Sequence, residues 1–370
     1  MFFALDFYIP ILPFYVLKAG GSEVSIGLLM GIFTLFSVLL RPFQGRKLDT
    51  GGRKKLLLSG IALYALTGLG LIMLPSLPLL FLFRALQGVG WGAFLLAFNT
   101  ITLDLAPPHR RGEVVGLVGI APPLSLATAP ILGSYLMAST EGNYSMLFIL
   151  AALVALVSFL FASLVREPKQ EKGQVQNITR ALFSKKVLFP SFAVLCMTFN
   201  LGAILAFLPL FGEARNIENI GSFFSVFAAT LLISRPLAGR LSDRVGREKV
   251  FLPALIIASS ALIMLSAVFS IQLALICAFI LGLGFGSAHS SIMALAADSL
   301  PVMERGVGMA TFTASFDLGI VIGSVIFGYF LPWLEFSGLF LVGAVIMILP
   351  IMAYFIFKRF KLKLGESLLD

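Results

Sequence analysis

The chain has 370 residues, of which 59% are hydrophobic and only 12% are charged, and its formal net charge is +9. Ordinary soluble domains have roughly 45 to 50% apolar and about 25% charged residues, so this composition argues against a water-soluble fold. The basic residues lie in short loops between apolar runs, and this scatter argues against nucleic acid as the partner. We therefore expect a membrane protein.

Apolar runs long enough to cross a bilayer as helices, about 20 residues each, recur almost from end to end. The first run, residues 1–17, has neither a basic flank before it nor a small-residue cleavage site after it, so we interpret it as a helix rather than a removed signal peptide. The expected spans are 1–18, 24–45, 55–75, 78–103, 114–137 and 145–165, followed by 188–212, 221–240, 250–270, 272–297, 307–331 and 337–357. The sequence thus predicts a six-helix bundle at 1–165, a cytoplasmic linker at 166–187, and a second bundle with a short tail at 188–370.

Lys and Arg residues are distributed unevenly between the two sides of the expected membrane. They gather in the loops after the second, fourth, sixth, eighth and tenth spans and in the C-terminal tail, whereas the opposite loops hold only Lys18 and Arg215. Basic residues near span ends are retained on the cytoplasmic side. We therefore expect a multi-pass protein of the inner membrane with both termini in the cytoplasm.

Many features of the first half recur in the second half at one fixed offset of 194 residues, which indicates an internal repeat. The recurring pairs include Arg41 and Arg235, Gly45 and Gly239, Asp49 and Asp243, Arg53 and Arg247, Gly88 and Gly282, and Asp104 and Asp298. Six spans, an even number, separate the two copies. Both copies therefore have the same orientation and form a parallel repeat.

The loop after the second span, Gly45-Arg-Lys-Leu-Asp49-Thr-Gly-Gly52-Arg53, resembles the signature loop of the major facilitator superfamily. A second copy begins at Gly239, and the resemblance extends over the whole chain. It implies an all-α membrane protein with the major facilitator fold, in which twelve transmembrane helices form two six-helix bundles related by a parallel pseudo-two-fold repeat.

The resemblance also implies contacts for the charged residues of both loops. Arg53 is expected to pair with Asp104 and Arg247 with Asp298, while Asp49 faces the start of the span at 307–331 near Gly306 and Asp243 faces the start of the span at 114–137. Glycine allows two helices to approach closely, and carboxylates beside cations can lock or release a neighbouring segment. We interpret Gly45, Asp49, Arg53, Asp104, Gly239, Asp243, Arg247 and Asp298 as a conformational latch. The alternative is a basic loop that only fixes the topology.

Three residues along the fourth span predict one wall of a cavity. Arg84-Ala-Leu-Gln87-Gly88 resembles a motif of proton-coupled members of the family. An isolated cation inside a membrane costs about 2.5 kcal/mol or more, so Arg84 is a candidate for function. Gln87 and Trp91 follow at i+3 and i+7 on the same helical stripe. The alternative is that the Arg84 side chain extends to the outer interface and takes no part in chemistry.

Two carboxylates near the middle of spans are candidates for proton coupling. The stretch around Asp6, Leu5-Asp6-Phe-Tyr-Ile-Pro10-Ile-Leu-Pro13, resembles the first helix of the drug:proton antiporter branch, only part of which has the acidic residue. Asp317 lies at mid-span in the eleventh helix. Burial favours the protonated form of a carboxyl group. We expect Asp6 to be the principal proton carrier, with its affinity set by Arg84, and Asp317 to be the second candidate. The alternative for each is a permanently protonated, hydrogen-bonded carboxyl.

Two further polar residues come from the second half. His289 follows Phe285 by one helical turn, and the repeat places this pair opposite the Trp91 stripe, so the imidazole is a candidate for proton coupling near physiological pH and Phe285 for the cavity wall. A lone histidine is more often a packing residue. Asn200 occupies the repeat position of Asp6 and is a weaker candidate for contact with the substrate.

The fifth span contains Ala129-Pro130-Ile-Leu-Gly133-Ser134, which resembles a glycine-proline motif of antiporters. Ala replaces the first Gly of the motif and Ser the last. The replacements remain small, so close helix packing is expected to survive. The departure weakens the assignment to exporters rather than importers.

The predicted function is secondary active transport by alternating access, most concretely proton-coupled export of a small amphipathic drug or metabolite. The partners are this solute, protons and the lipid bilayer, and we expect a monomer. No stretch resembles a nucleotide-binding loop, and Cys196 and Cys277 lie inside apolar runs without metal-ligand spacing, so no ATP, cofactor or metal is expected. A proton-driven importer or a uniporter of a metabolite is the alternative, and a non-transporting receptor a remote one. The few nucleophilic or metal-binding groups argue against an enzyme.

Overall fold

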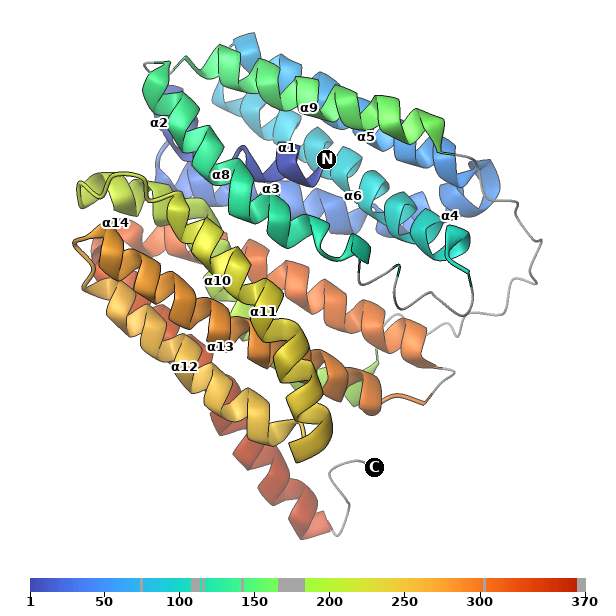
Figure 1. Cartoon of the computed structure of the whole chain (residues 1–370), viewed down its shortest axis with the longest axis vertical. Helices are drawn as coiled ribbons and strands as arrows, with labels where there is room; N and C mark the ends of the chain where they lie inside the picture. The colour runs from blue at the N-terminus through green and yellow to red at the C-terminus, as the bar shows by residue number, and fades with distance from the viewer. Residues whose placement is uncertain are drawn as a thin grey trace. The chain divides into compact units, whose positions relative to one another are not determined.

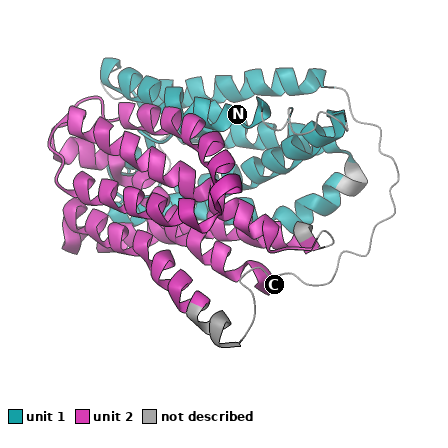
Figure 2. Cartoon of the chain, turned by 60° about the horizontal axis from the view of Figure 1, so that its bottom comes forward, with its two compact units in different colours: residues 1–178 teal, residues 179–370 magenta. Residues whose placement is uncertain are grey.

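The computed structural model describes residues 1–73, 76–107, 114, 117–140, 143–165, 184–301 and 304–364. The chain divides into two compact units, Met1–Ile178 and Thr179–Asp370, which are coloured separately in Figure 2. The division falls inside the stretch 166–187 that the sequence predicts as a linker. Residues 166–183 of that stretch lie outside the described residues.

Unit 1 is built from helices in its described part (Figure 1). They are α1 (Phe2–Asp6), α2 (Leu12–Lys18), α3 (Glu23–Leu39), α4 (Arg41–Gly51), α5 (Arg53–Gly70), the 3-10 helix η1 (Leu71–Met73), α6 (Leu77–Leu105), α8 (Ala121–Ser139) and α9 (Tyr144–Leu164). The first expected span is interrupted between α1 and α2, where Pro10 has no backbone N–H to donate. Helices α3 and α4 meet at a bend of 41°, next to Pro42.

Unit 2 is likewise helical where the structure describes it. Its helices are η3 (Lys185–Val187), α10 (Leu188–Ala214), α11 (Ser222–Val245), α12 (Glu248–Ser266), α13 (Ile271–Asp298) and α14 (Arg305–Leu364). The long α14 is broken at Glu335, whose φ of 53° lies outside the helical region. This break separates the two spans that the sequence predicts at 307–331 and 337–357.

Helical structure therefore lies at each of the twelve expected spans. By length and apolar composition, seven helices of the described part can cross a membrane, or eight if the bent pair α3 and α4 is one span. Four differences make this number lower than twelve. The helices α1 and α2 are two pieces of one expected span, and α14 contains two spans. The helix α5 starts with three basic residues, Arg53, Lys54 and Lys55, and α8, which contains three prolines, is not among the helices that are apolar enough.

Glycines show that the two units repeat the same helix crossings. A Cβ atom on Gly90 of α6 would lie 2.7 Å from the Gly60 carbonyl oxygen of α5. In unit 2, a Cβ atom on Gly284 of α13 would lie 2.6 Å from the Ala254 carbonyl oxygen of α12. Ala254 and Gly284 lie 194 residues after Gly60 and Gly90, which is the offset of the sequence repeat. The repeat seen in the sequence is therefore also a repeat of helix packing. Only glycine permits such close backbone approach.

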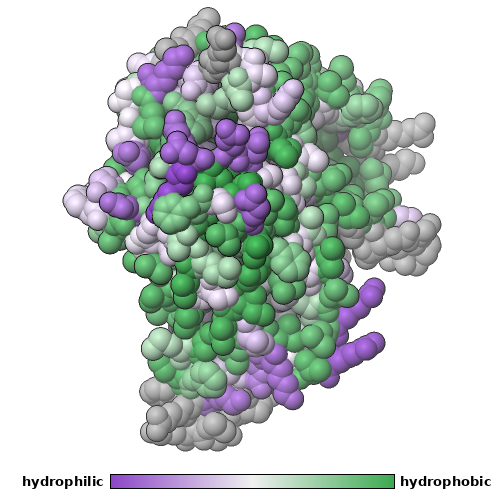
Figure 3. Space-filling model, turned by 60° about the vertical axis from the view of Figure 1, so that its left-hand side comes forward, coloured by the Kyte–Doolittle hydropathy of each residue, from purple (hydrophilic) through white to green (hydrophobic). Residues whose placement is uncertain are grey.

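The outside of the described helices carries many large apolar side chains. Examples are Phe161 and Phe269, each 68% exposed, Leu164 at 77% and Trp333 at 65%. On the face shown in Figure 3, hydrophobic residues cover a broad area, and hydrophilic residues gather above and below it. In lipid, helices satisfy their own backbone hydrogen bonds and can expose such side chains. The arrangement is that of a multi-pass membrane protein.

Candidate functional site

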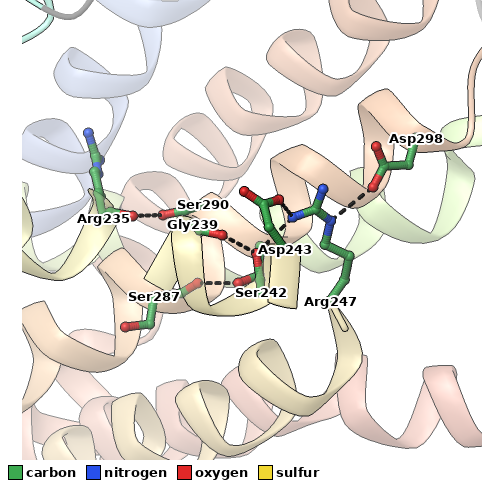
Figure 4. A network of polar contacts seen from close by, with 9 residues as sticks. Arg235, Gly239, Ser242, Asp243, Arg247, Ser287, Ser290 and Asp298 are labelled. Carbon is green, nitrogen blue, oxygen red and sulfur yellow. Dashed lines mark hydrogen bonds and ion pairs between the residues drawn. The ribbon is translucent and has the colours of Figure 1, made fainter. Parts of the chain in front are cut away.

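A hydrogen-bond network surrounds the second copy of the signature loop, between α11 and α12 (Figure 4). Arg247 donates from Nε to Asp298 at the end of α13 over 2.9 Å. Its Nη1 donates to Ser242 Oγ over 2.9 Å and also to Asp243. The Ser242 hydroxyl then donates to the Gly239 carbonyl oxygen at 2.8 Å. One guanidinium thus joins the end of α11 to the end of α13.

The charges of this network stabilise the protonated arginine. Partial desolvation lowers the pKa of the Arg247 guanidinium, but the hydrogen bonds to Asp298 and Asp243 outweigh it and raise this pKa above its usual value. The Arg247 side chain is 22% exposed, against 46% for Asp298 and 63% for Asp243. Because both carboxylates are well exposed to solvent, each pair contributes only about 0.2 to 1 kcal/mol.

The first copy of the loop contains the equivalent ion pair, between Arg53 Nη1 and the Asp104 carboxylate. Both ion pairs that the family resemblance implies are therefore present. The residue before each arginine is a glycine with positive φ, 97° at Gly52 and 101° at Gly246, a conformation that favours glycine. The side chain of Asp49 lies outside the described residues.

The glycines that open the two loops do not lie at close helix approaches. A Cβ atom on Gly45 or Gly239 would meet no described atom within 4 Å. The expectation that these glycines bring two helices together is therefore not met in this structure, whereas glycines of other helices, such as Gly90 of α6 and Gly284 of α13, do make close approaches. The contacts implied for Asp49 and Asp243 join the two units and stay predictions.

Arg84 is buried inside α6, with 2% of its surface exposed. Its Nη1 donates to Gln87 Oε1 over 2.8 Å, and its guanidinium carbon lies 4.3 Å from the ring centroid of Phe33. Gln87 Nε2 in turn donates to the Tyr8 hydroxyl at 3.4 Å. A cation over an aromatic face is stabilised without a carboxylate. The side chain therefore points into unit 1 and does not extend to an interface.

Trp91 belongs to an aromatic cluster of unit 1. Its ring is T-shaped against Phe2, with centroids 5.2 Å apart, and tilted against Phe94 at 5.3 Å. Trp91 is 8% exposed and Gln87 is fully buried. Both residues lie near Arg84 along α6, as the helical stripe predicts, but both are covered here. Their role as a cavity wall stays a prediction.

The Asp6 carboxylate lies at the end of α1, where the first helix breaks. It accepts a hydrogen bond from Ser125 Oγ of α8 over 2.6 Å, and the residue is partly buried. The Arg84 guanidinium instead donates to Gln87, so direct pairing between Asp6 and Arg84 is absent from the contacts described. Tyr8, two residues after Asp6, connects the broken helix to Gln87.

The glycine-proline motif packs against this break. A Cβ atom on Gly133 of α8 would lie 2.9 Å from Pro10 Cγ and 3.1 Å from the Phe7 carbonyl oxygen. The turn between α1 and α2 therefore rests directly on α8. Close packing is therefore present at Gly133, and the expectation for the replacements Ala129 and Ser134 stays a prediction.

His289 lies among aromatic rings of unit 2. Its ring centroid is 6.2 Å from those of Phe285 and Phe312 and 5.5 Å from that of Phe316. The imidazole is partly buried. Phe285 is the neighbour that the sequence predicts, whereas Phe312 and Phe316 come from α14.

Asn200 and Asp317 have different surroundings within unit 2. The Asn200 amide donates to the Cys196 carbonyl oxygen at 3.1 Å, and its own side-chain oxygen faces Gly343 of α14. These contacts are typical of a packed polar residue and give no support to a contact between Asn200 and substrate. Asp317 lies within α14 and is partly buried, in agreement with its expected mid-span position.

Sequence reasoning missed the partners of these residues. Tyr8 accepts a hydrogen bond from Gln87, and Ser125 donates one to Asp6. Phe33 of α3 faces the Arg84 guanidinium. Tyr8 could have been identified from the sequence, because it carries a hydroxyl group in an apolar run two residues after Asp6. Ser125 and Phe33 lie on other helices from their partners, so only the helix packing identifies them.

Comparison with known proteins identifies the family to which this architecture belongs. The family model described as Major Facilitator Superfamily matches residues 1–223 and 216–366. The multidrug resistance protein MdtG of Salmonella choleraesuis (strain SC-B67) is 30% identical over 310 residues, covering 79% of this chain and 76% of that protein. MdtG of Klebsiella pneumoniae (strain 342) is 29% identical over 361 residues, covering 92% and 86%.

Solved structures of the same fold are more distant in sequence. A bacterial homolog of the human lysosomal transporter Spinster, in an inward-facing and unoccupied conformation, superposes with a TM-score of 0.81 at 15% identity, covering 98% of this chain and 95% of that chain. A D-xylose-proton symporter superposes with a TM-score of 0.74 at 15% identity, covering 94% of each chain. The duplicated loop with its two ion pairs, the repeated helix crossings and the family match agree, and the chain belongs to the Major Facilitator Superfamily of secondary transporters.

Proposed function

We propose that this transporter exports small amphipathic molecules in exchange for protons. The observation that carries the proposal is the Asp6 carboxylate, which lies at a break of the first helix and is hydrogen-bonded to Ser125. A carboxyl at such a break can exchange a proton when the surrounding helices move. The relatives named multidrug resistance protein support export as the direction.

Asp6 is the principal proton carrier in this proposal. Arg84 sets its affinity indirectly, because the guanidinium reaches the broken helix through Gln87 and Tyr8. Asp317 and His289 are the candidates for proton coupling in unit 2.

Gln87, Trp91 and Phe285 line the substrate cavity in this proposal, and the aromatic rings around Trp91 and His289 suit an amphipathic solute. Asn200 was a further candidate, but its contacts to Cys196 and Gly343 do not favour it.

The two loop networks act as a latch between conformations. Arg53 with Asp104 and Arg247 with Asp298 hold each loop in shape, as their ion pairs support. In this proposal Asp49 and Asp243 engage and release the other unit during alternating access, and Asp243 leaves its contact with Arg247 when it does so. Gly45 and Gly239 leave open space in which such a contact can form.

We propose that the transporter lies in the inner membrane as a monomer with both termini in the cytoplasm. The excess of Lys and Arg in alternate loops and in the C-terminal tail supports this orientation of the termini. Cysteines introduced near each terminus, labelled by a membrane-impermeant reagent only after the cells are opened, test this placement.

Proteoliposomes with an imposed pH gradient separate export from its alternatives, a proton-driven importer and a uniporter. An antiporter accumulates its solute when the vesicle interior is acidic, because protons leave as solute enters. A symporter accumulates solute when the exterior is acidic, and a uniporter responds to neither gradient. The result does not depend on the orientation of the protein in the vesicle. Accumulation only with an acidic exterior overturns the exporter proposal.

A further inference from the structure

The Ser125 hydroxyl group of α8 donates to a different helix. Its Oγ atom lies 2.6 Å from Oδ2 of Asp6 at the end of α1, and Ser125 is only 6% exposed. A serine or threonine inside a helix commonly donates to a carbonyl oxygen one turn earlier in the same helix. Thr128 of α8 does so, with the Leu124 carbonyl oxygen at 2.8 Å. A hydroxyl group has one hydrogen to donate, so Ser125 binds the carboxylate in place of its own backbone.

The helix α1 ends at Asp6 because of Pro10. Proline has no backbone N–H, so the Asp6 carbonyl oxygen cannot accept the usual helical bond from residue i+4. It accepts from the Ile9 N–H instead, at 3.1 Å. The Asp6 carboxyl group therefore lies at a helix end, where α8 packs against α1 (Figure 1). The hydrogen bond from Ser125 and the contact of Gly133 join α8 to this break at two points.

The equivalent helix crossing of unit 2 lacks this pair. The offset of 194 residues places Asn200 at the position of Asp6. It places Gly319, which has no side chain, at the position of Ser125. The Asn200 amide donates to a backbone carbonyl of its own helix, and a Cβ atom on Gly319 would lie 2.6 Å from the Leu195 carbonyl oxygen of α10. The helix crossing therefore forms without a carboxylate and a hydroxyl, so their presence in unit 1 points to function.

The other groups around Asp6 leave Ser125 as its direct partner. The helices α8 and α9, which both pack against α1, have no charged side chain. The Met1 amino group and the Tyr64 phenol of α5 lie close enough for their charges to interact with the carboxylate. The Arg84 guanidinium of α6 is hydrogen-bonded within its own helix. Among the described residues, Ser125 is the one whose side chain donates a hydrogen bond to Asp6.

We propose that Ser125 is a positioning residue that sets the proton affinity of Asp6 and links this proton to the contact between α1 and α8. This inference rests on the proposed function and adds the residue that controls its proton site. A hydrogen bond donated to an ionised carboxylate favours the ionised form, so Ser125 promotes release of the proton.

The same hydrogen bond responds to the proton. A protonated carboxyl group makes hydrogen bonds roughly half as strong as those of a carboxylate. The Ser125 hydroxyl can then turn to the Ala121 carbonyl oxygen, one turn earlier in α8. Proton uptake at Asp6 therefore weakens the link between α1 and α8, and proton release restores it.

The experiment is an infrared pH titration of the whole chain in nanodiscs of phosphatidylcholine. It follows the carbonyl stretch of protonated carboxyl groups, and the part of the signal that Asp6→Asn removes from each protein belongs to Asp6. The test variants are Ser125→Ala, which removes the donor, Ser125→Cys, which leaves a weak one, and Ser125→Thr, which keeps the hydroxyl. Thr128→Val is the matched control, because it removes a hydroxyl group that donates to backbone carbonyls of the same helix.

We expect the midpoint of the Asp6 titration to rise by about 1 to 2 pH units in Ser125→Ala, because a hydrogen bond to a charged group is lost. Ser125→Cys should give a smaller rise, whereas Ser125→Thr and Thr128→Val should titrate as wild type. A role of Ser125 in packing alone would not move the midpoint in this order. A thermal unfolding scan identifies variants that do not fold, and if Ser125→Ala is among them, the Ser125→Cys titration decides.

Three results overturn the proposal. They are an unchanged or lowered midpoint in the folded Ser125 variant that decides, an equal rise in Thr128→Val, and a wild type without a carboxyl signal that Asp6→Asn removes. The titration needs no solute and no gradient, so its outcome is separate from transport. A raised midpoint without accumulation driven by an acidic interior refutes the proposed function and leaves the role of Ser125 intact. Accumulation that depends on Asp6, with an unchanged midpoint in Ser125→Ala, has the opposite meaning.

Discussion

The Arg247 network allows a quantitative prediction for single substitutions. Arg247 donates to Asp298 at 2.9 Å, to Ser242 at 2.9 Å and to Asp243. Replacing Arg247 by Gln removes all three interactions, and we expect it to lower the free energy of unfolding by about 1 to 2 kcal/mol, the sum of a few exposed pairs. Asp298→Asn leaves the other two acceptors and should cost about 0.5 to 1 kcal/mol. Asp243, the most exposed partner, should matter least for stability.

The assay is thermal unfolding of the purified protein in one detergent, at low and high salt. A loss of 1 kcal/mol corresponds to a fall in Tm of about 2 to 4 °C for a chain of 150 to 250 residues, and to a smaller fall in a longer one. High salt should reduce the difference, because it screens exposed pairs. The double-mutant cycle of Arg247→Gln with Asp298→Asn isolates their coupling, expected at about 0.5 to 1 kcal/mol.

The matched control is Lys186→Gln, which removes one exposed pair, Lys186 with Glu304, in the same unit. Its effect on Tm should be smaller than that of Arg247→Gln. The folded-state pKa of Arg247 lies above its unfolded value, so its stabilisation is fully present below the unfolded pKa and is lost only as pH rises through the folded one, far above neutrality. The Arg247 contribution should therefore be constant from pH 6 to pH 9. A zero coupling energy, or equal effects of Arg247→Gln and Lys186→Gln, would refute the reasoning.

Three further predictions concern the latch, the helix packing and the cavity. Asp49→Asn and Asp243→Asn should impair transport in proteoliposomes while leaving Tm nearly unchanged, and unchanged transport in both variants would contradict the latch. Gly284→Ala should lower the free energy of unfolding by about 1 to 3 kcal/mol, because its Cβ would meet backbone atoms of α12 at 2.5 and 2.6 Å, whereas Gly239→Ala, with open space beside it, should not. A cysteine introduced as Trp91→Cys should react with a bulky thiol reagent more slowly when a transported compound is present, and labelling that ignores every transported compound would remove Trp91 from the cavity.

Most of the fold was predictable because a bilayer imposes simple rules on sequence. Each of the expected spans contains helix, and the fixed offset between the halves reappears in the contacts of Gly90 and Gly284. The break between α1 and α2 was not predicted, although Pro10 marks it. Hydropathy averages over a window and therefore does not register a missing backbone donor.

The site was predictable where partners follow from a duplicated motif. Arg53 with Asp104 and Arg247 with Asp298 are confirmed ion pairs, since the repeat supplies both members in register. The partners of Asp6 and Arg84 were not predictable in this way, because Ser125 of α8 donates to the Asp6 carboxylate and Arg84 donates to Gln87.

The partners of Arg84 and His289 on other helices were not predictable from the sequence either. The environment of Arg84 depends on Phe33 of α3, and that of His289 on two rings of α14. Such contacts between helices depend on how the helices rotate and cross, which spacing along one helix does not determine.

Proton coupling through Asp6 is tested most directly in proteoliposomes that contain wild type, Asp6→Asn or Asp317→Asn. We predict that Asp6→Asn abolishes accumulation driven by an acidic interior but preserves exchange of labelled for unlabelled solute without a gradient, because only the proton step is lost. If coupling persists in Asp6→Asn and disappears in Asp317→Asn, the proton carrier is Asp317, and the role assigned here to Asp6 is wrong.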